Sequence, residues 1–177
     1  MSDPKLPKNS RPYPRPVEKR VVKLNEGSKK ARLSAARLAA VQVLYQIKLS
    51  GHKPQEALMD FINNRIGFEI DGDVLVPADR DLLTDIVNGV SGHRLELGEI
   101  IEGHLKNHGK TRVDDLLEAV LYCGAYELMA HQDTDAPIIL ADYMNVVHAF
   151  YEDGAPKMIN AMLDAIASSL RGPKDAD

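Results

Sequence analysis

Few residues in this 177-residue chain have the types and spacing that catalysis or metal binding requires. His104 and His108 are four residues apart near a predicted helix end, as two metal ligands would be, but the sequence offers no third ligand nearby. Cys123 is the only cysteine and lies among apolar residues, which favours a buried structural thiol over a nucleophile. Phosphate-binding glycine loops, zinc-protease motifs and nucleophile elbows are missing. We therefore predict that the protein is not an enzyme and has no cofactor and no metal site.

Basic residues are the more informative chemistry, and they are concentrated at the start of the chain. Residues 1–37 contain eleven Lys or Arg and three acidic residues, whereas the whole chain has a net charge of −4. A basic arm on an acidic body is typical of proteins that bind a polyanion such as nucleic acid. The alternative is a solubilising tail.

Arg37 is the residue whose role the sequence leaves most open. In a predicted helix over residues 28–50, Lys30, Arg37 and Lys48 point in nearly the same direction, and Arg37 lies within a broad apolar arc. A guanidinium there either pairs with a carboxylate inside the protein or faces a partner. Basic groups beside an aromatic residue, here Tyr45, form the phosphate- and base-binding surface of many RNA-binding proteins. We favour the RNA contact.

The elements that must position these residues are helices. Residues 1–27 are rich in Pro, Lys and Arg and are predicted to be a disordered basic arm, residues 28–171 a single helical domain, and residues 172–177 a frayed tail. The spacing of apolar residues predicts helices over 28–50, 54–66, 78–108 with a split at Ser91-Gly92, 113–130, 136–151 and 156–170. The segment 67–77 is either a short hairpin or an ordered loop. The fold class is all-α.

The expected location is the cytoplasm. No apolar run approaches the roughly 20 residues of a membrane span, and the N-terminus lacks the apolar region of a secretory signal. A single cysteine is consistent with a reducing compartment.

Three motifs occur in the same order as in the NusB family of bacterial transcription antitermination factors. The segment "KKARLSAARLAAVQVLYQIKLSG" resembles the family's opening helix, "VDDLLEAVLYCGAYELM" its central helix, and "KMINAMLDAIA" its closing helix. The matching residues are Ala40, Gln42, Leu44, Tyr45, Gln46, Ala119, Val120, Leu121, Tyr126, Glu127, Leu128, Lys157, Asn160, Leu163 and Asp164. The resemblance covers residues 28–170.

This resemblance implies two perpendicular three-helix bundles and no catalysis. It implies that the protein pairs with NusE, a small-subunit ribosomal protein that doubles as a transcription factor. The pair would bind single-stranded boxA RNA of ribosomal RNA operons, and the RNA polymerase elongation complex carrying it would read through terminators.

The resemblance also places the site residues. Lys29, Lys30, Arg32 and Arg37 would neutralise phosphates, and Tyr45 would stack on a base or contact the backbone. Lys157 matches a family position on the RNA face, and Met158 replaces the usual aromatic there. The acidic residues Asp114, Asp115 and Glu118 would suit a basic ribosomal partner. For the two aspartates, the alternative of stabilising a helix N-terminus is favoured slightly, and Glu127 is interpreted as a structural partner for a buried donor.

Departures from the family pattern keep two other functions open. Leu33, Ser34 and Ala35 stand where the family often has arginines, and Ala161 replaces a usual glycine, so RNA affinity or sequence preference is expected to differ. A helical protein adaptor without RNA binding would need the same core. An accessory partner of an RNA methyltransferase is a further possibility, because NusB-like domains also precede some of those enzymes. The sequence does not give the RNA sequence or the oligomeric state.

Overall fold

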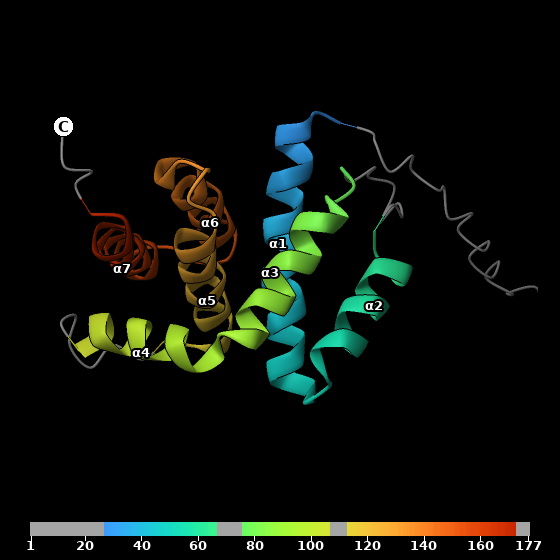
Figure 1. The fold of residues 1–177 in the computed structure, drawn as a ribbon, viewed down its shortest axis with the longest axis horizontal. Coiled ribbons are helices and arrows are strands. Elements are labelled where there is room, and N and C mark those ends of the chain that lie inside the picture. Colours follow the sequence, from blue (N-terminus) through green and yellow to red (C-terminus); the bar gives the residue numbers. More distant parts are fainter. Residues whose placement is uncertain (1–26, 67–75, 107–112, 173–177) are drawn as a thin grey trace, which may run out of the picture.

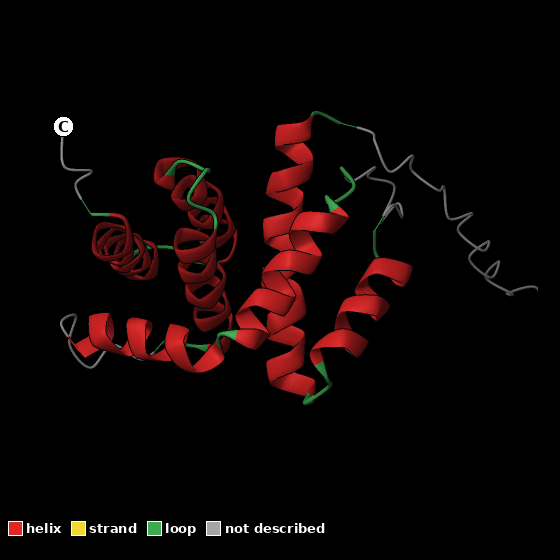
Figure 2. Ribbon diagram, in the orientation of Figure 1, coloured by secondary structure: helices red, strands yellow, loops and turns green. Residues whose placement is uncertain are grey.

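The computed structural model describes residues 27–66, 76–106 and 113–172. Within these ranges all regular structure is helical (Figure 2), which confirms the all-α prediction. The seven helices of the described residues are α1 (Lys29–Ser50), α2 (Pro54–Asn64), α3 (Arg80–Gly92), α4 (Arg94–Leu105), α5 (Asp115–Ala130), α6 (Ala136–Phe150) and α7 (Gly154–Arg171). The basic arm, and all of the tail except Gly172, lie outside the described residues and stay predictions.

Local sequence signals set most helix boundaries. The Ser28 side chain accepts a hydrogen bond from the backbone N–H of Ala31, and Gly51 ends α1 in the left-handed conformation at φ 69°. The predicted break after Ser91-Gly92 is confirmed, because α3 ends at Gly92 and α4 begins at Arg94. Most of the predicted hairpin or loop, residues 67–75, lies outside the described residues, and the four residues from Val76 to Asp79 form no strand.

The helices form two groups that share one core (Figure 1). Helices α1, α2 and α3 pack together as the first group, and α4, α5, α6 and α7 form the second. The second group contains four helices, because the predicted helical stretch 78–108 divides at Gly92 into α3 of the first group and α4 of the second. Helix α5 packs against α1 and α3 as well as against its own group, and most of its residues are buried. This helix joins the two groups.

Contacts between helix ends show how the elements run. Lys48, near the end of α1, forms an ion pair with Glu118, near the start of α5, at 3.0 Å. Asp114, which caps α5, accepts a hydrogen bond from the hydroxyl of Tyr151, directly after α6. Arg171, at the end of α7, donates to the backbone carbonyl of Leu128, near the end of α5. The start of α1 and the ends of α5 and α7 therefore lie at one end of the molecule, which we call the α1-start end. The end of α1 and the starts of α5 and α7 lie at the other end, which we call the α1-finish end.

Every helix of the described residues is too short or too polar to cross a membrane.

Candidate nucleic-acid interface

A groove runs along the seam between α1 and α6, and its upper part lies beside the first basic residues of α1. Lys29 and Lys30 are exposed at the start of α1. They line a hollow of about 770 Å³ between the first halves of the two helices. Its other lining residues are Leu33, Ser34, Arg37, Leu82, His131, Thr134, Pro137, Ile138, Ala141, Asp142 and Asn145. The hollow combines apolar walls with cationic side chains at one end, which suits a ligand with flat apolar faces and negative charge.

The groove continues along the seam toward Tyr45. A second hollow of about 260 Å³ shares Ser34, Asp142 and Asn145 with the first. Further along α1, the half-buried Tyr45 lines a third hollow of about 480 Å³ with the exposed Phe150 of α6. The three hollows follow one another along the length of α1, and we call them together the α1–α6 groove.

Arg37 does not face the solvent. Only 4% of the residue is exposed, and its Nε and Nη2 atoms donate to the two carboxylate oxygens of Glu127 at 2.8 and 2.9 Å. Its Nη1 atom donates to Asp142 Oδ2 at 2.7 Å. The prediction that Arg37 contacts RNA is therefore corrected: an arginine buried within the apolar arc of α1 is held by carboxylates from α5 and α6.

Glu127 is the centre of this buried network, as predicted for a structural partner of a buried donor. The residue is 0% exposed and also accepts a hydrogen bond from the Tyr143 hydroxyl at 2.7 Å. Its burial would raise the pKa of the carboxyl, but hydrogen bonds with His131 and Arg37 and the Arg37 charge lower the pKa below its usual value. Glu127 is therefore a buried carboxylate whose charge Arg37 compensates.

His131 extends the network to the surface, and sequence reasoning missed it. Its Nδ1 atom lies 3.2 Å from Glu127 Oε1, and its Nε2 atom lies 2.6 Å from Asp85 Oδ2 on α3. The hydrogen bond with Glu127 raises the pKa of His131; burial acts in the opposite direction, and Asp85 adds to the increase. The signal in the sequence was the spacing of four residues between Glu127 and His131, which places both on one face of a helix.

The predicted acidic residues mostly have partners within the chain. Asp114 accepts hydrogen bonds from the backbone N–H groups of Leu116 and Leu117, so it stabilises the N-terminus of α5 as the alternative reading proposed. Glu118 pairs with Lys48 and with Arg94, whose side chains lie 3.0 and 3.3 Å away. Asp115 is half-buried in the first turn of α5.

The predicted RNA-contacting residues fall into two sets at opposite ends of the molecule. Lys29, Lys30 and Arg32 belong to the α1-start end, where Arg32 is half-buried and its Nε atom has no hydrogen-bond partner among the described residues. Lys157 and Met158 lie in the first turn of α7, at the α1-finish end, where Lys157 is exposed and Met158 half-buried. The α1–α6 groove runs between these ends.

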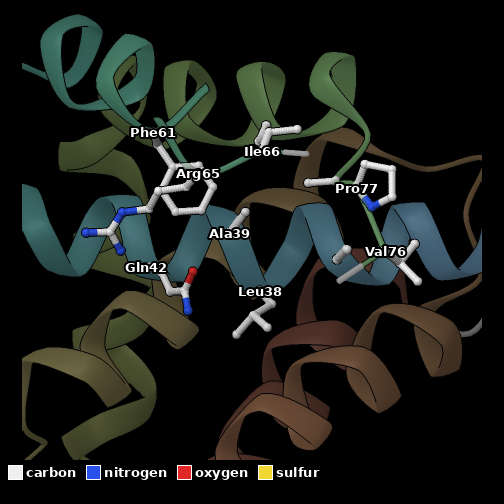
Figure 3. Close-up of a pocket in the computed structure, with 10 residues that line it drawn as sticks. Leu38, Ala39, Gln42, Phe61, Arg65, Ile66, Val76 and Pro77 are labelled. Carbon is white, nitrogen blue, oxygen red and sulfur yellow. The ribbon is translucent and has the colours of Figure 1, made fainter. Parts of the chain in front are cut away.

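A further hollow of about 270 Å³ lies between α1 and α2 (Figure 3) and shares Ala35 and Leu38 of α1 with the second hollow. Leu38, Ala39 and Gln42 of α1 line it together with Phe61 and Arg65, all of which the close-up labels. The Arg65 guanidinium lies 5.6 Å from the centre of the Phe61 ring. Arg65 is the one charged residue in its lining, whereas the first hollow has the exposed Lys29 and Lys30, so the first hollow is better suited to a polyanion.

Other candidate chemistry gains no support from the described residues. The side chain of Cys123 is buried, as predicted for a structural thiol. His104 directs Nδ1 to the backbone carbonyl of Ile100 at 2.8 Å, and His108 lies outside the described residues. Within the described ranges, no group of three His, Cys, Asp or Glu residues could hold a metal ion.

Comparisons of the sequence with known proteins agree with one another. The family model of the NusB family matches residues 34–168. The transcription antitermination protein NusB of Rhodopseudomonas palustris is 38% identical over 173 residues, which are 97% of this chain and 96% of that protein. The protein of the same name from Rhizobium rhizogenes is 37% identical over 139 residues, 78% of this chain and 87% of that protein.

Solved structures share the fold. A crystal structure of the antitermination factors NusB and NusE in complex with double-stranded RNA superposes with a TM-score of 0.65 and 24% identity, over 80% of this chain and 99% of that chain. The solution structure of NusB from Aquifex aeolicus gives a TM-score of 0.60 and 23% identity, over 85% of this chain and 97% of that chain.

Proposed function

The chain belongs to the NusB family, and from this premise we propose that it is a non-catalytic transcription antitermination factor. It pairs with NusE and binds single-stranded boxA RNA of ribosomal operons on the elongating RNA polymerase in the cytoplasm. Support comes from relatives of this chain that are transcription antitermination proteins. A structural neighbour of the same fold is a NusB that forms a complex with NusE and RNA.

The observation that carries the RNA-binding part is the α1–α6 groove with the exposed Lys29 and Lys30 at its α1-start end. Lys29 and Lys30 hold phosphates at the α1-start end, and Lys157 does so at the α1-finish end. With a rise of 1.5 Å per residue, Lys30 and Tyr45 are roughly 22 Å apart along α1, so a single strand several nucleotides long is needed to contact both. The apolar walls of the groove receive bases, and Tyr45 offers a ring for stacking.

Met158 changes one contact in this arrangement. A thioether side chain packs against a base but has no ring to stack on it. With Arg37 buried and Leu33, Ser34 and Ala35 uncharged, the groove carries few cations of its own. Lysine contacts to phosphates position RNA without reading its sequence. Sequence-specific affinity therefore depends on the composite surface formed with NusE.

NusE pairs with the α1-finish end. Asp115 and its acidic neighbours Asp114 and Glu118 lie there at the start of α5, close to the Tyr45 hollow. An acidic surface favours association with a basic ribosomal protein and speeds the encounter. A partner bound there would extend the RNA-binding groove.

The test is fluorescence anisotropy with boxA RNA and a scrambled RNA of equal composition, with and without purified NusE. We expect weak binding alone and tighter, boxA-selective binding with NusE. The double variant Lys29→Gln/Lys30→Gln should reduce affinity and lower the slope of log affinity against log salt by about 1.4, since each lost phosphate contact on a single strand contributes ~0.7. Lys53→Gln/Lys106→Gln is the matched control, because both lysines are exposed and line none of the three hollows. Equal affinity for both RNAs with NusE present would contradict the proposal.

One observation favours a second candidate, a helical protein adaptor without RNA binding. Arg37 was predicted to contact RNA from the middle of α1, but it is buried and paired with Glu127, so it is not available to a phosphate. If this function is correct, NusE binds as expected, but boxA RNA is not bound either by the protein alone or by its complex with NusE.

A further inference from the structure

The third hollow of the α1–α6 groove is lined by exposed apolar side chains. Phe150, the last residue of α6, is 56% exposed, and Leu49, near the end of α1, is 61% exposed. Both line this hollow of about 480 Å³, together with the half-buried Tyr45 and Leu116. A single exposed apolar side chain is ordinary on a protein surface, whereas several around one hollow indicate a surface that binds a ligand.

Polar side chains form the rest of this lining. Gln42 and Gln46 are one turn apart on α1, and each half-buried amide can both donate and accept hydrogen bonds. Arg65, directly after α2, is exposed and adds a positive charge. Its guanidinium lies 5.6 Å from the centre of the Phe61 ring, which fixes the charge beside the hollow (Figure 3). Among the described residues, no carboxylate forms an ion pair with Arg65.

The lining matches a nucleotide. A base is a flat apolar ring with hydrogen-bonding groups along its edge, and the phosphate that follows it is an anion. Proteins commonly hold the unstacked bases of single-stranded RNA by stacking them on aromatic rings. The exposed Phe150 offers such a ring, and the two glutamine amides can bond to the edge of any base because they donate as well as accept.

A segment of a partner protein is the alternative ligand. An apolar segment would also cover Phe150 and Leu49, but it would leave the Arg65 charge without a counter-ion. A base with its phosphate matches the apolar surface and the charge together. The observations therefore favour RNA over a protein segment.

We propose that the third hollow is a base-binding subsite, in which one unstacked base of single-stranded RNA stacks on Phe150 and Arg65 pairs with a neighbouring phosphate. The three hollows follow one another along α1, so a strand held by Lys29 and Lys30 in the first hollow reaches the third several nucleotides further on. This inference rests on the proposed RNA-binding function and adds to it two contacts that sequence reasoning missed.

The test measures the affinity of the full chain for boxA RNA by fluorescence anisotropy, with and without NusE. Phe150→Ala should weaken binding by roughly 5- to 100-fold, the effect of losing one stack between a base and an aromatic ring. Phe150→Tyr keeps the ring and should bind as the wild type does. Phe150→Leu keeps an apolar side chain without a ring and should bind weakly. Leu95→Ala is the matched control, because Leu95 is 85% exposed and lines none of the three hollows.

Arg65→Gln tests the phosphate contact separately. The slope of log affinity against log salt should decrease by about 0.7, the contribution of one phosphate contact on a single strand. Arg80→Gln is the matched control, an exposed arginine at the start of α3 that lines none of the three hollows, and should leave the slope unchanged.

RNAs that lack a single base identify the base that stacks on Phe150. In a series of boxA RNAs with one abasic position each, one position should weaken binding to the wild type about as much as Phe150→Ala does. Removal of that base should have no further effect on Phe150→Ala, because the stack is already lost. Circular dichroism establishes that each variant is folded.

Three results would overturn the inference while leaving the proposed function intact. One is unchanged RNA affinity in Phe150→Ala, and another is full affinity in Phe150→Leu. The third is weaker binding of NusE to Phe150→Ala with unchanged RNA affinity of the protein alone, which would make the hollow a protein-binding surface. Failure of the wild type to bind boxA RNA, with or without NusE, would reject the proposed function together with the inference.

Discussion

Replacing Arg37 by alanine tests the buried network most directly. The substitution removes three hydrogen bonds, two to Glu127 and one to Asp142, and leaves the fully buried Glu127 carboxylate without its cation. Removing one member of a buried ion pair typically costs about 3–5 kcal/mol of unfolding free energy. For a chain of this size each 1 kcal/mol lowers the melting temperature by roughly 2–4 °C, so the expected decrease is about 6–20 °C.

Thermal and urea denaturation, followed by circular dichroism, measure this loss. Arg37→Lys keeps the charge but not the planar group that contacts both carboxylate oxygens, so we expect it to recover only part of the stability. Lys30→Ala is the matched control on the same helix, where an exposed side chain should contribute less than ~0.5 kcal/mol. The double variant Arg37→Met/Glu127→Gln should be more stable than Arg37→Ala, because it removes the unpaired buried charge.

The pKa of Glu127 gives the same prediction a pH dependence. Its folded pKa is below the unfolded value, so the carboxylate contributes stability above the unfolded pKa and loses it as pH falls through the folded pKa. The stability difference between wild type and Arg37→Ala should therefore decrease in acid. A variant destabilised by less than about 1 kcal/mol at neutral pH, with reduced RNA affinity, would refute this reasoning and restore Arg37 as an RNA contact.

Three more predictions concern other parts of the fold. The pKa of His131 is raised in the folded protein. Its contribution to the free energy of unfolding is therefore fully present below the unfolded pKa and is lost as pH rises through the folded pKa. His131→Gln should remove this pH dependence from the stability measured by urea denaturation. Arg171 donates to backbone carbonyls at the end of α5, and Arg171→Ala should cost about 1.5–3 kcal/mol and increase hydrogen exchange there, whereas unchanged exchange would contradict this capping role. Gly89→Ala should destabilise by roughly 1–3 kcal/mol because its Cβ would overlap the Tyr126 ring. Gly92→Ala, which meets nothing within 4 Å, should not destabilise the protein, and equal melting temperatures for the two glycine variants would contradict this.

The sequence by itself determined the helices, their approximate ends and the family. Ser28 begins α1 through a side-chain hydrogen bond to a residue three positions away, and Gly51 ends it through its left-handed backbone conformation. The spacing of apolar residues is likewise a property of neighbouring residues in the chain. The same is true of the break after Gly92. Such features need no knowledge of the rest of the chain, and for this reason the all-α class could be predicted.

Only the tertiary structure decided what Arg37 does and where the candidate RNA residues lie. Arg37 is paired with Glu127 and Asp142, which are 90 and 105 residues away in the chain, so no local pattern distinguishes a paired arginine from one that faces RNA. Lys30 and Lys157, in turn, lie in the first turns of α1 and α7, and only Lys30 lines the α1–α6 groove. The physical reason is that a buried charge is stable only beside an opposite charge. Which carboxylate lies beside Arg37 depends on how the helices pack across the whole core.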